Sequence, residues 1–168
     1  MIKVAIIEDL DSYREAIQLL ISQTPGMECV GAYSNGEKAL EELPAFGAQV
    51  GLVDIGLPGM SGIQLVQRLH KAAPQILCMM CTAYDEDEKV FHALEAGAHG
   101  YLLKTTTPDK IIEAIQELMQ GGAPMSSQVA RKVVTAFQKT ILTIMNIPSQ
   151  QGNRRPYNYW QKGFCIKK

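Results

Sequence analysis

Short apolar runs alternate with helical periodicities along the first 120 residues of the chain. Each run is bounded by turn residues or charged residues, which is typical of strands in a buried sheet. One run, residues 27–33, mixes polar and apolar positions, as expected of an edge strand with one covered face. The five predicted strands span residues 3–7, 27–33, 50–54, 76–81 and 100–103.

Between and after these runs, apolar residues recur at helical spacing. Tyr13, Ile17 and Leu20 define the first helix, and Asp11 or Ser12 is its expected N-cap. Four further helices are predicted at about residues 36–43, 62–73, 85–96 and 107–120. Strands that alternate with helices predict an α/β fold, in which right-handed crossovers cover both faces of a parallel sheet.

The edge character of residues 27–33 predicts the strand order. If that strand is outermost, the chain forms a doubly wound five-stranded parallel sheet of order 2-1-3-4-5. The order then reverses between the first and third strands, and such sheets bind ligands at the carboxyl ends of the strands flanking that point. Glu8 and Asp9 end the first strand and Asp54 ends the third, so we expect all three acids in one crevice.

Polar groups also end the fourth and fifth strands, as Thr82 and Lys104. Carboxylates about 4 Å apart repel by roughly 4 kcal/mol per pair at an effective dielectric constant near 20. Mg²⁺ would relieve that repulsion, since it takes one or two carboxylates, keeps several waters and coordinates phosphate oxygens. A hydroxyl and an ammonium would serve the oxygens of a phosphoryl group, which makes Asp54 the predicted nucleophile. Standing alone, Asp54 would be read as a helix N-cap.

These motifs resemble those of a response-regulator receiver domain, also called CheY-like, over about residues 1–121. The resemblance implies a flavodoxin-like fold and a cytoplasmic two-component signalling protein that is a phosphoacceptor assisting its own chemistry rather than an enzyme. The matching residues are Glu8-Asp9, Asp54 within D-x-x-L-P-G-M-x-G, Thr82-Ala83, and Gly-Tyr-Leu-Leu-Lys ending at Lys104.

By this resemblance, Asp54 takes a phosphoryl group from a sensor histidine kinase, and Thr82 and Lys104 assist. Thr82 and Tyr101 would form a switch pair, in which the hydroxyl moves to the phosphate and the ring turns inward. The switch would remodel the face of the fourth helix, fifth strand and fifth helix, where a twin receiver or an output domain would dock. The expected Mg²⁺ ligands are Glu8, Asp9, Asp54 and the backbone carbonyl of Gly56.

Two local features qualify the resemblance. Many receivers have proline after the lysine, whereas Thr105 follows Lys104 here, as in a subgroup with a DNA-binding output. The isomer of that peptide bond stays open at this point. Gly56 and Tyr84 occupy loop positions that influence phosphoryl lifetime in the family.

A breaker cluster at residues 121–125 is expected to close the receiver at residue 121. A linker helix is predicted within residues 122–142. Its sequence resembles the linkers that join receivers to helix-turn-helix domains of the LuxR/NarL type. Residues 143–168 show no periodicity, which predicts disorder. The tail can be back-translated with permitted synonymous codons. Reading the same bases two positions later can then give the start of a LuxR-type DNA-binding domain. We therefore hypothesise a frameshifted remnant of a transcription factor, which would bind DNA only through an output domain absent from this chain.

Charge and cysteine placement narrow the alternatives. Residues 1–120 contain all 17 acidic residues and 8 basic ones, a net charge of −9, which argues against nucleic-acid binding there. Residues 121–168 contain 8 basic residues and no acid. Cys78 and Cys81 form a C-x-x-C inside a predicted strand, where residues three apart point to opposite faces, so buried thiols are expected. Without a signal-peptide pattern or a membrane-length apolar run, we expect a cytoplasmic protein with no membrane contact.

Two other functions are compatible with parts of the pattern. An aspartate phosphatase of the haloacid dehalogenase kind would use Asp9 and Asp11, but it leaves Asp54 and its loop unexplained. A flavin or nucleotide module would usually carry a glycine-rich or hydroxyl-rich first loop, whereas the loop here is acidic.

Overall fold

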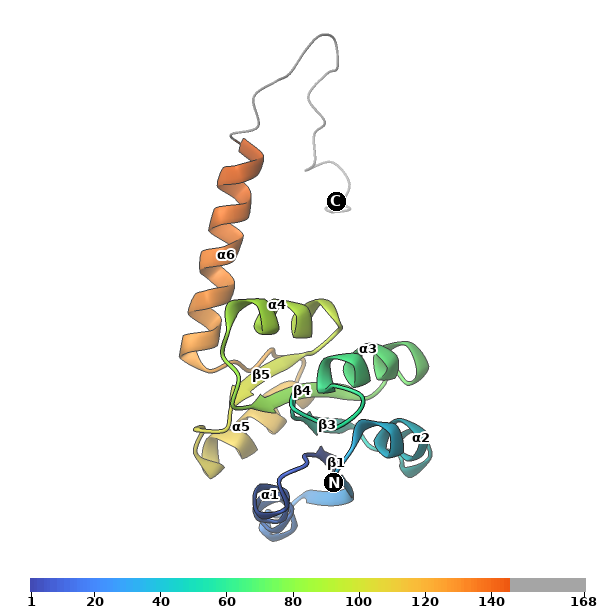
Figure 1. The fold of residues 1–168 in the computed structure, drawn as a ribbon. Helices are drawn as coiled ribbons and strands as arrows, with labels where there is room; N and C mark the ends of the chain where they lie inside the picture. Colours follow the sequence, from blue (N-terminus) through green and yellow to red (C-terminus); the bar gives the residue numbers. More distant parts are fainter. Residues whose placement is uncertain (146–168) are drawn as a thin grey trace, which may run out of the picture.

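The computed structural model describes residues 1–145, in which five parallel strands form one sheet covered by helices on both faces (Figure 1). The strand order is β2-β1-β3-β4-β5, as predicted. The strands are β1 (Ile2–Ile7), β2 (Met27–Tyr33), β3 (Val50–Val53), β4 (Leu77–Thr82) and β5 (Gly100–Leu103). The helices are α1 (Asp11–Gln23), α2 (Gly36–Phe46), α3 (Gly62–Ala72), α4 (Asp87–Glu95), α5 (Pro108–Met119) and α6 (Ser127–Met145).

The sheet separates two hydrophobic clusters. Helices α1 and α5 pack on one face, where Ile17 and Ile115 meet β-strand residues such as Leu52. Helices α2, α3 and α4 cover the other face, where Leu65 meets Val53. Neighbouring strand residues enter opposite clusters because strand side chains alternate between faces. Both faces are therefore covered, and the strand ends are left as the place for a site.

Three boundaries differ from the sequence predictions. Helix α1 has Leu10 as its N-cap, without a side-chain hydrogen bond, so the expected cap by Asp11 or Ser12 is wrong. Asp11 instead pairs with Arg14 one turn later. Helix α4 begins at Asp87, two residues later than expected, and α2 continues through Pro44 to Phe46.

The segment after α5 is bound to the sheet before it enters α6. The backbone N–H of Tyr101 in β5 donates to the carbonyl of Pro124 at 2.9 Å, and the N–H of Ser126 donates to the carbonyl of Tyr101 at 3.2 Å. The first turns of α6 then pack against α4, with Val129 buried, and the rest of α6 rises beyond α4 (Figure 1). The predicted C-terminal helix is confirmed, and it includes residues 143–145, where disorder was expected. The remaining tail, with its frameshift hypothesis, lies outside the described residues.

Candidate functional site

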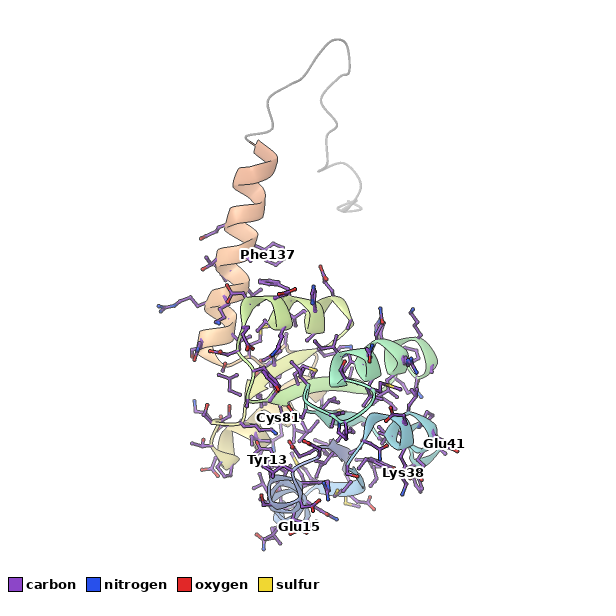
Figure 2. The ribbon with its side chains drawn as sticks, in the orientation of Figure 1. Tyr13, Glu15, Lys38, Glu41, Cys81 and Phe137 are labelled. Carbon is purple, nitrogen blue, oxygen red and sulfur yellow. The ribbon has the colours of Figure 1, made fainter. Side chains whose placement is uncertain are left out.

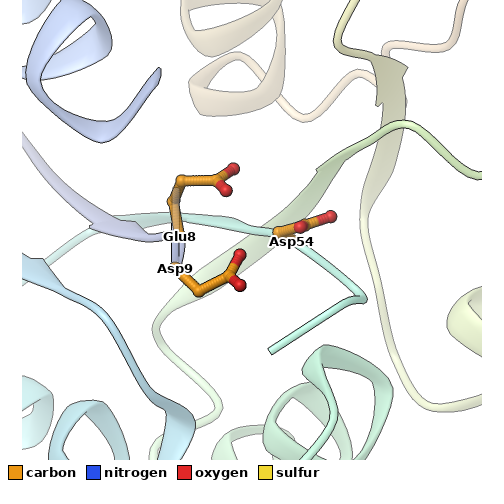
Figure 3. A group of neighbouring side chains, drawn as sticks. All are labelled: Glu8, Asp9 and Asp54. Carbon is orange, nitrogen blue, oxygen red and sulfur yellow. The ribbon is translucent and has the colours of Figure 1, made fainter. Parts of the chain in front are cut away.

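Three carboxylates meet at the carboxyl ends of the central strands. Strands β1 and β3 pair in parallel with Ile7 opposite Val53, so the residues that follow begin at the same edge. Glu8, Asp9 and Asp54 each offer a carboxylate oxygen within 4.8 Å of the other two (Figure 3). Glu8 is 2% exposed and Asp54 6%, whereas Asp9 is exposed. Two of the three acids are therefore removed from water while the third faces it.

Lys104 supplies a positive charge between the two buried acids. Its ammonium lies 2.7 Å from Glu8 Oε2 and 3.1 Å from Asp54 Oδ2. The backbone N–H of Lys104 donates to the carbonyl of Thr82, which fixes the end of β5 beside β4. Burial opposes the charged ammonium, but its hydrogen bonds to both carboxylates outweigh burial and raise the pKa of Lys104.

Burial shifts the pKa of Glu8 upward, whereas burial alone would shift the pKa of its partner Lys104 downward. Removal from water raises the pKa of the Glu8 carboxyl, and the hydrogen bond from Lys104 offsets only part of that effect. The backbone N–H of Leu10 also donates to Glu8, at 3.1 Å. The site therefore combines three acids with one lysine, and its negative charge is only partly neutralised.

One carboxylate oxygen at this site has no partner. Asp54 Oδ2 accepts from Lys104, whereas Oδ1 is buried without a hydrogen-bond partner among the described residues. An unpaired buried oxygen is costly, and a hard cation that prefers oxygen ligands would satisfy it. The donor set of Glu8, Asp9 and Asp54 therefore fits Mg²⁺.

The two residues expected to form a switch lie beside this cluster. Thr82 is buried at the end of β4, where its hydroxyl accepts from the backbone N–H of Tyr84 at 3.4 Å. The ring of Tyr101 is fully buried, and its hydroxyl donates to the carbonyl of Tyr84 at 2.7 Å. The ring is thus already inward, the position that the resemblance assigns to the switched arrangement.

Tyr84 and Gly56 face each other across the mouth of the site. A methyl group placed on Gly56 would lie 3.3 Å from the Tyr84 ring and 3.4 Å from Asp54 Oδ2. The ring is partly exposed, and the ammonium of Lys89 lies 3.4 Å from its centre, a cation–π contact. The Tyr84 side chain therefore lies close to the carboxylate that is expected to carry phosphate.

Tyr13 and Arg14 on α1 support the site, a role that no sequence motif predicted. The Tyr13 hydroxyl lies 3.2 Å from Cys81 Sγ, and its ring centre lies 5.1 Å from the Lys104 ammonium (both side chains of the first pair are labelled in Figure 2). Arg14 donates to the backbone carbonyl of Glu8 at 2.7 Å, which holds the acid-bearing loop. Helical spacing placed Tyr13 on an inner face but carried no information on these contacts.

The structure also determines the state of the cysteine pair and of the peptide bond after Lys104. Cys78 and Cys81 are both buried, as predicted, and burial raises their pKa values to about 12 and about 11. Residues 1–145 contain no cis peptide bond, so the bond between Lys104 and Thr105 is trans.

Comparison with known proteins decides the family. A profile of the response regulator receiver domain matches residues 4–116. This range includes the carboxyl ends of all five strands and omits only the first two residues of β1. The chain belongs to the response regulator receiver family. Members of this family are typically non-enzymatic phosphoacceptors, and receiver domains pair with histidine kinases.

Relatives of the receiver are transcriptional regulators of the NarL/LuxR group. It is 34% identical over 138 residues to UhpA of Escherichia coli K12, covering 82% of this chain and 69% of that protein. It is 29% identical over 140 residues to DegU of Brevibacillus brevis, covering 83% of this chain and 59% of that protein. Since the alignment spans little more than half of DegU, the activities of whole regulators do not transfer directly.

Solved structures agree with the fold. The receiver domain of the putative response regulator NarL from Mycobacterium tuberculosis is 30% identical, has a TM-score of 0.69 and covers 71% of this chain and 97% of that one. The isolated receiver domain of RcsB from Salmonella enterica, solved with a beryllium fluoride phosphate mimic, has a TM-score of 0.72 at 22% identity and covers 78% of this chain and 97% of that one. At that identity the second likeness shows the fold alone.

The phosphatase alternative has no support in the geometry. It required Asp9 and Asp11 to work together, but the Asp11 side chain is 76% exposed and pairs with Arg14. Asp54, which that alternative left unexplained, is buried, and one of its oxygens has no hydrogen-bond partner in the part of the chain that the structure describes. None of the helices within residues 1–145 combines the length and the hydrophobicity that a membrane span requires.

Proposed function

We propose that Asp54 accepts a phosphoryl group from a sensor histidine kinase and that the chain then switches conformation to control an output. The single observation that supports this most is Asp54 Oδ1, which is buried, has no hydrogen-bond partner within residues 1–145, and lies next to two further acids and a lysine. A carboxylate held in this way can bind a cation through one oxygen and attack phosphorus with the other, once Lys104 moves from Asp54 Oδ2 to the incoming phosphoryl group. We propose Glu8, Asp9 and Asp54, which offer carboxylate oxygens within 4.8 Å of one another, as Mg²⁺ ligands. The family resemblance adds the Gly56 carbonyl, and Mg²⁺ would offset negative charge on the phosphoryl oxygens.

The transfer is a displacement at phosphorus. The Asp54 carboxylate forms a bond to phosphorus as the phosphorus–nitrogen bond of the kinase phosphohistidine breaks, and the imidazole keeps that electron pair and takes up a proton. Lys104, now bound to Asp54 Oδ2, would pair with a phosphoryl oxygen. The Thr82 hydroxyl, at the end of β4, would donate to another. These two groups stabilise charge that the carboxylate alone would repel.

The output surface belongs to the same proposal. Phosphate adds negative charge beside Thr82. The Tyr101 hydroxyl donates to the carbonyl of Tyr84, which connects the loop after Thr82 to β5. We propose the face of α4, β5 and α5 as the docking surface for a twin receiver or an output domain. Residues 124–126 and the first turns of α6 already lie along β5 and α4, so an incoming partner would share this face with the linker.

The domain division is proposed with this output in mind. Residues 1–121 would be the receiver, residues 122–142 the linker helix and residues 143–168 an aberrant tail. In the parent protein the output would be transcription, since UhpA and DegU are named as transcriptional regulatory proteins. DNA would then be bound only through an output domain, and the protein would act in the cytoplasm.

Intact-mass measurement after incubation with acetyl phosphate and Mg²⁺ tests the central step. The parent chain should gain the mass of one phosphoryl group, and Asp54→Asn should gain none. Asp109→Asn, which neutralises an exposed acid on α5, is the matched control and should behave as the parent. A gain that persists in Asp54→Asn would refute the assignment of Asp54.

A further inference from the structure

The loop between β4 and α4, residues 83–86, lies between the phosphoacceptor site and α6. On the side of the site, the backbone N–H of Tyr84 donates to Thr82, and the Tyr84 carbonyl accepts from Tyr101. The Tyr84 ring lies close to Gly56, on the side where Asp54 Oδ2 is also found. Any movement of this loop would therefore move Tyr84 relative to the acyl phosphate expected on Asp54.

On its other side, the same loop is held by two residues of α6. The Lys132 ammonium donates to the backbone carbonyl of Asp85 and lies 3.1 Å from the carboxylate of Asp87. The Gln128 amide donates to the Asp85 carboxylate. Two adjacent backbone carbonyls, those of Tyr84 and Asp85, are thus bound by Tyr101 and by Lys132.

Helix α6 is seated firmly enough to hold the loop in place. Val129 is fully buried in the cluster under α4, and Val133 packs against that cluster. The preceding residues, Pro124 to Ser126, are bonded to the backbone of Tyr101. All these contacts come from residues beyond 116, where the match to the receiver family ends.

We infer that Lys132 is a positioning residue for the phosphorylated site: by binding Asp85 and Asp87, it keeps Tyr84 beside Asp54 and shields the acyl phosphate from water. This inference rests on the proposed role of Asp54. Loss of the phosphate is attack of water on phosphorus: the bond from phosphorus to Asp54 breaks, the carboxylate leaves with its electron pair, and the water releases a proton to solvent. Tyr84 would slow that attack by occupying the approach to the site. Because coupling between two sites is reciprocal, phosphate on Asp54 should also alter how tightly α6 is docked.

The lifetime of the phosphoryl group measures this directly. Full-length chains are phosphorylated with acetyl phosphate and Mg²⁺, the donor is removed, and loss of the added mass is followed with time. Lys132→Gln should shorten the lifetime about two- to fivefold, the size expected for a partly exposed ion pair. Asp87→Asn, which removes the partner of Lys132, should shorten it similarly, and Lys132→Arg should restore the parent value.

Arg131→Gln is the matched control, because it removes one positive charge from an exposed neighbouring position. It should leave the lifetime at the parent value, and urea unfolding should show that all variants are folded. The reciprocal effect is measured as hydrogen exchange of residues 127–133, which should change when beryllium fluoride and Mg²⁺ are added to the parent and should not change in Lys132→Gln.

The outcomes separate this inference from the proposed function. If the parent is phosphorylated but Lys132→Gln keeps its lifetime, the inference is wrong and the role of Asp54 stands. If Arg131→Gln shortens the lifetime as much as Lys132→Gln, the effect is one of general charge, and the inference is also wrong. If the parent takes up no phosphate, the proposed function fails and the inference fails with it.

Discussion

Glu8 shows how a single residue can oppose the stability of the fold that carries it. Its carboxyl is almost completely buried, and burial raises its pKa although Lys104 donates to it. The folded state therefore holds a proton on Glu8 more tightly than the unfolded state does. A residue with this behaviour destabilises the folded chain once it is ionised, and a bound cation would reduce that cost.

This shift predicts a pH dependence of stability. In the absence of Mg²⁺, the free energy of unfolding of the parent should fall as pH rises from 4.5, the ordinary pKa of glutamate, through the raised pKa of folded Glu8. Glu8→Gln stays neutral and should lack this fall. Urea unfolding at a series of pH values from 4.5 to neutrality measures both slopes. Glu15→Gln, at an exposed position of α1, should keep the parent slope, and equal slopes in the parent and Glu8→Gln would contradict the prediction.

The residues of the site could be predicted from the sequence to a definite limit. Glu8, Asp54 and Lys104 each follow an apolar strand, and the carboxyl ends of parallel strands share one edge, so their meeting follows from topology. The contacts of Tyr13 and Arg14 depend on how α1 lies over the sheet, and spacing along one helix does not determine that. Whether the ring of Tyr101 lies inward likewise depends on packing between elements.

At the scale of elements, the start of α3 fixes the backbone that carries Asp54. Ser61 caps the helix and forms a reciprocal capping box with Gln64. Gly62, the first helical residue, lies so near the end of β3 that an added methyl group would be 1.9 Å from the carbonyl oxygen of Asp54. The helix can approach the phosphoacceptor this closely only with glycine at that position.

Gly62→Ala should therefore displace either α3 or Asp54. We expect a loss of about 3 kcal/mol in the free energy of unfolding, at the upper end of the cost of overpacking a buried position, and slower phosphorylation by acetyl phosphate. Gly51→Ala is the matched control in β3, where the added methyl group would have its nearest neighbour at 3.8 Å. Urea unfolding and intact mass provide the two measurements, and a Gly62→Ala chain as stable as Gly51→Ala would disprove the account.

Elements were predictable where a pattern had one physical meaning. The mixed polarity of residues 27–33 indicated an edge strand, and from it the whole strand order followed. The start of α1 was wrong because Asp11 is as favourable in a first helical turn as at an N-cap, and Arg14 is available to pair with it there. Helix α6 was predictable as a helix, but the apolar spacing of Val129 and Val133 does not reveal that α4 is their partner.

At the scale of the whole molecule, charge is divided along the chain. Residues 1–120 carry a net charge of −9, and residues 121–168 carry 8 basic residues and no acid. Lys132 forms a direct ionic contact between the basic and acidic parts, since it joins α6 to the acidic start of α4. Long-range attraction of this kind favours a linker docked on the receiver, and short-range packing at Val129 fixes where it docks.

The contribution of the docked linker can be measured by shortening the chain. A chain that ends after Gly122 loses the two hydrogen bonds to the Tyr101 backbone and the burial of Val129. Burying one valine side chain contributes about 1.5–3 kcal/mol and each of the two hydrogen bonds about 1 kcal/mol, so we expect the free energy of unfolding to fall by about 4 kcal/mol. Urea unfolding provides the measurement.

A chain that ends after Gln138 is the control, because it keeps every contact named here and still removes the tail. It should retain the stability of the full chain, since the contacts of α6 with the receiver described here come from residues up to Val133. Equal stability of the two shortened chains would mean that the linker lies on the receiver without stabilising it. The linker would then have too little binding free energy to hold the β4–α4 loop, because a helix that detaches freely cannot restrain Tyr84.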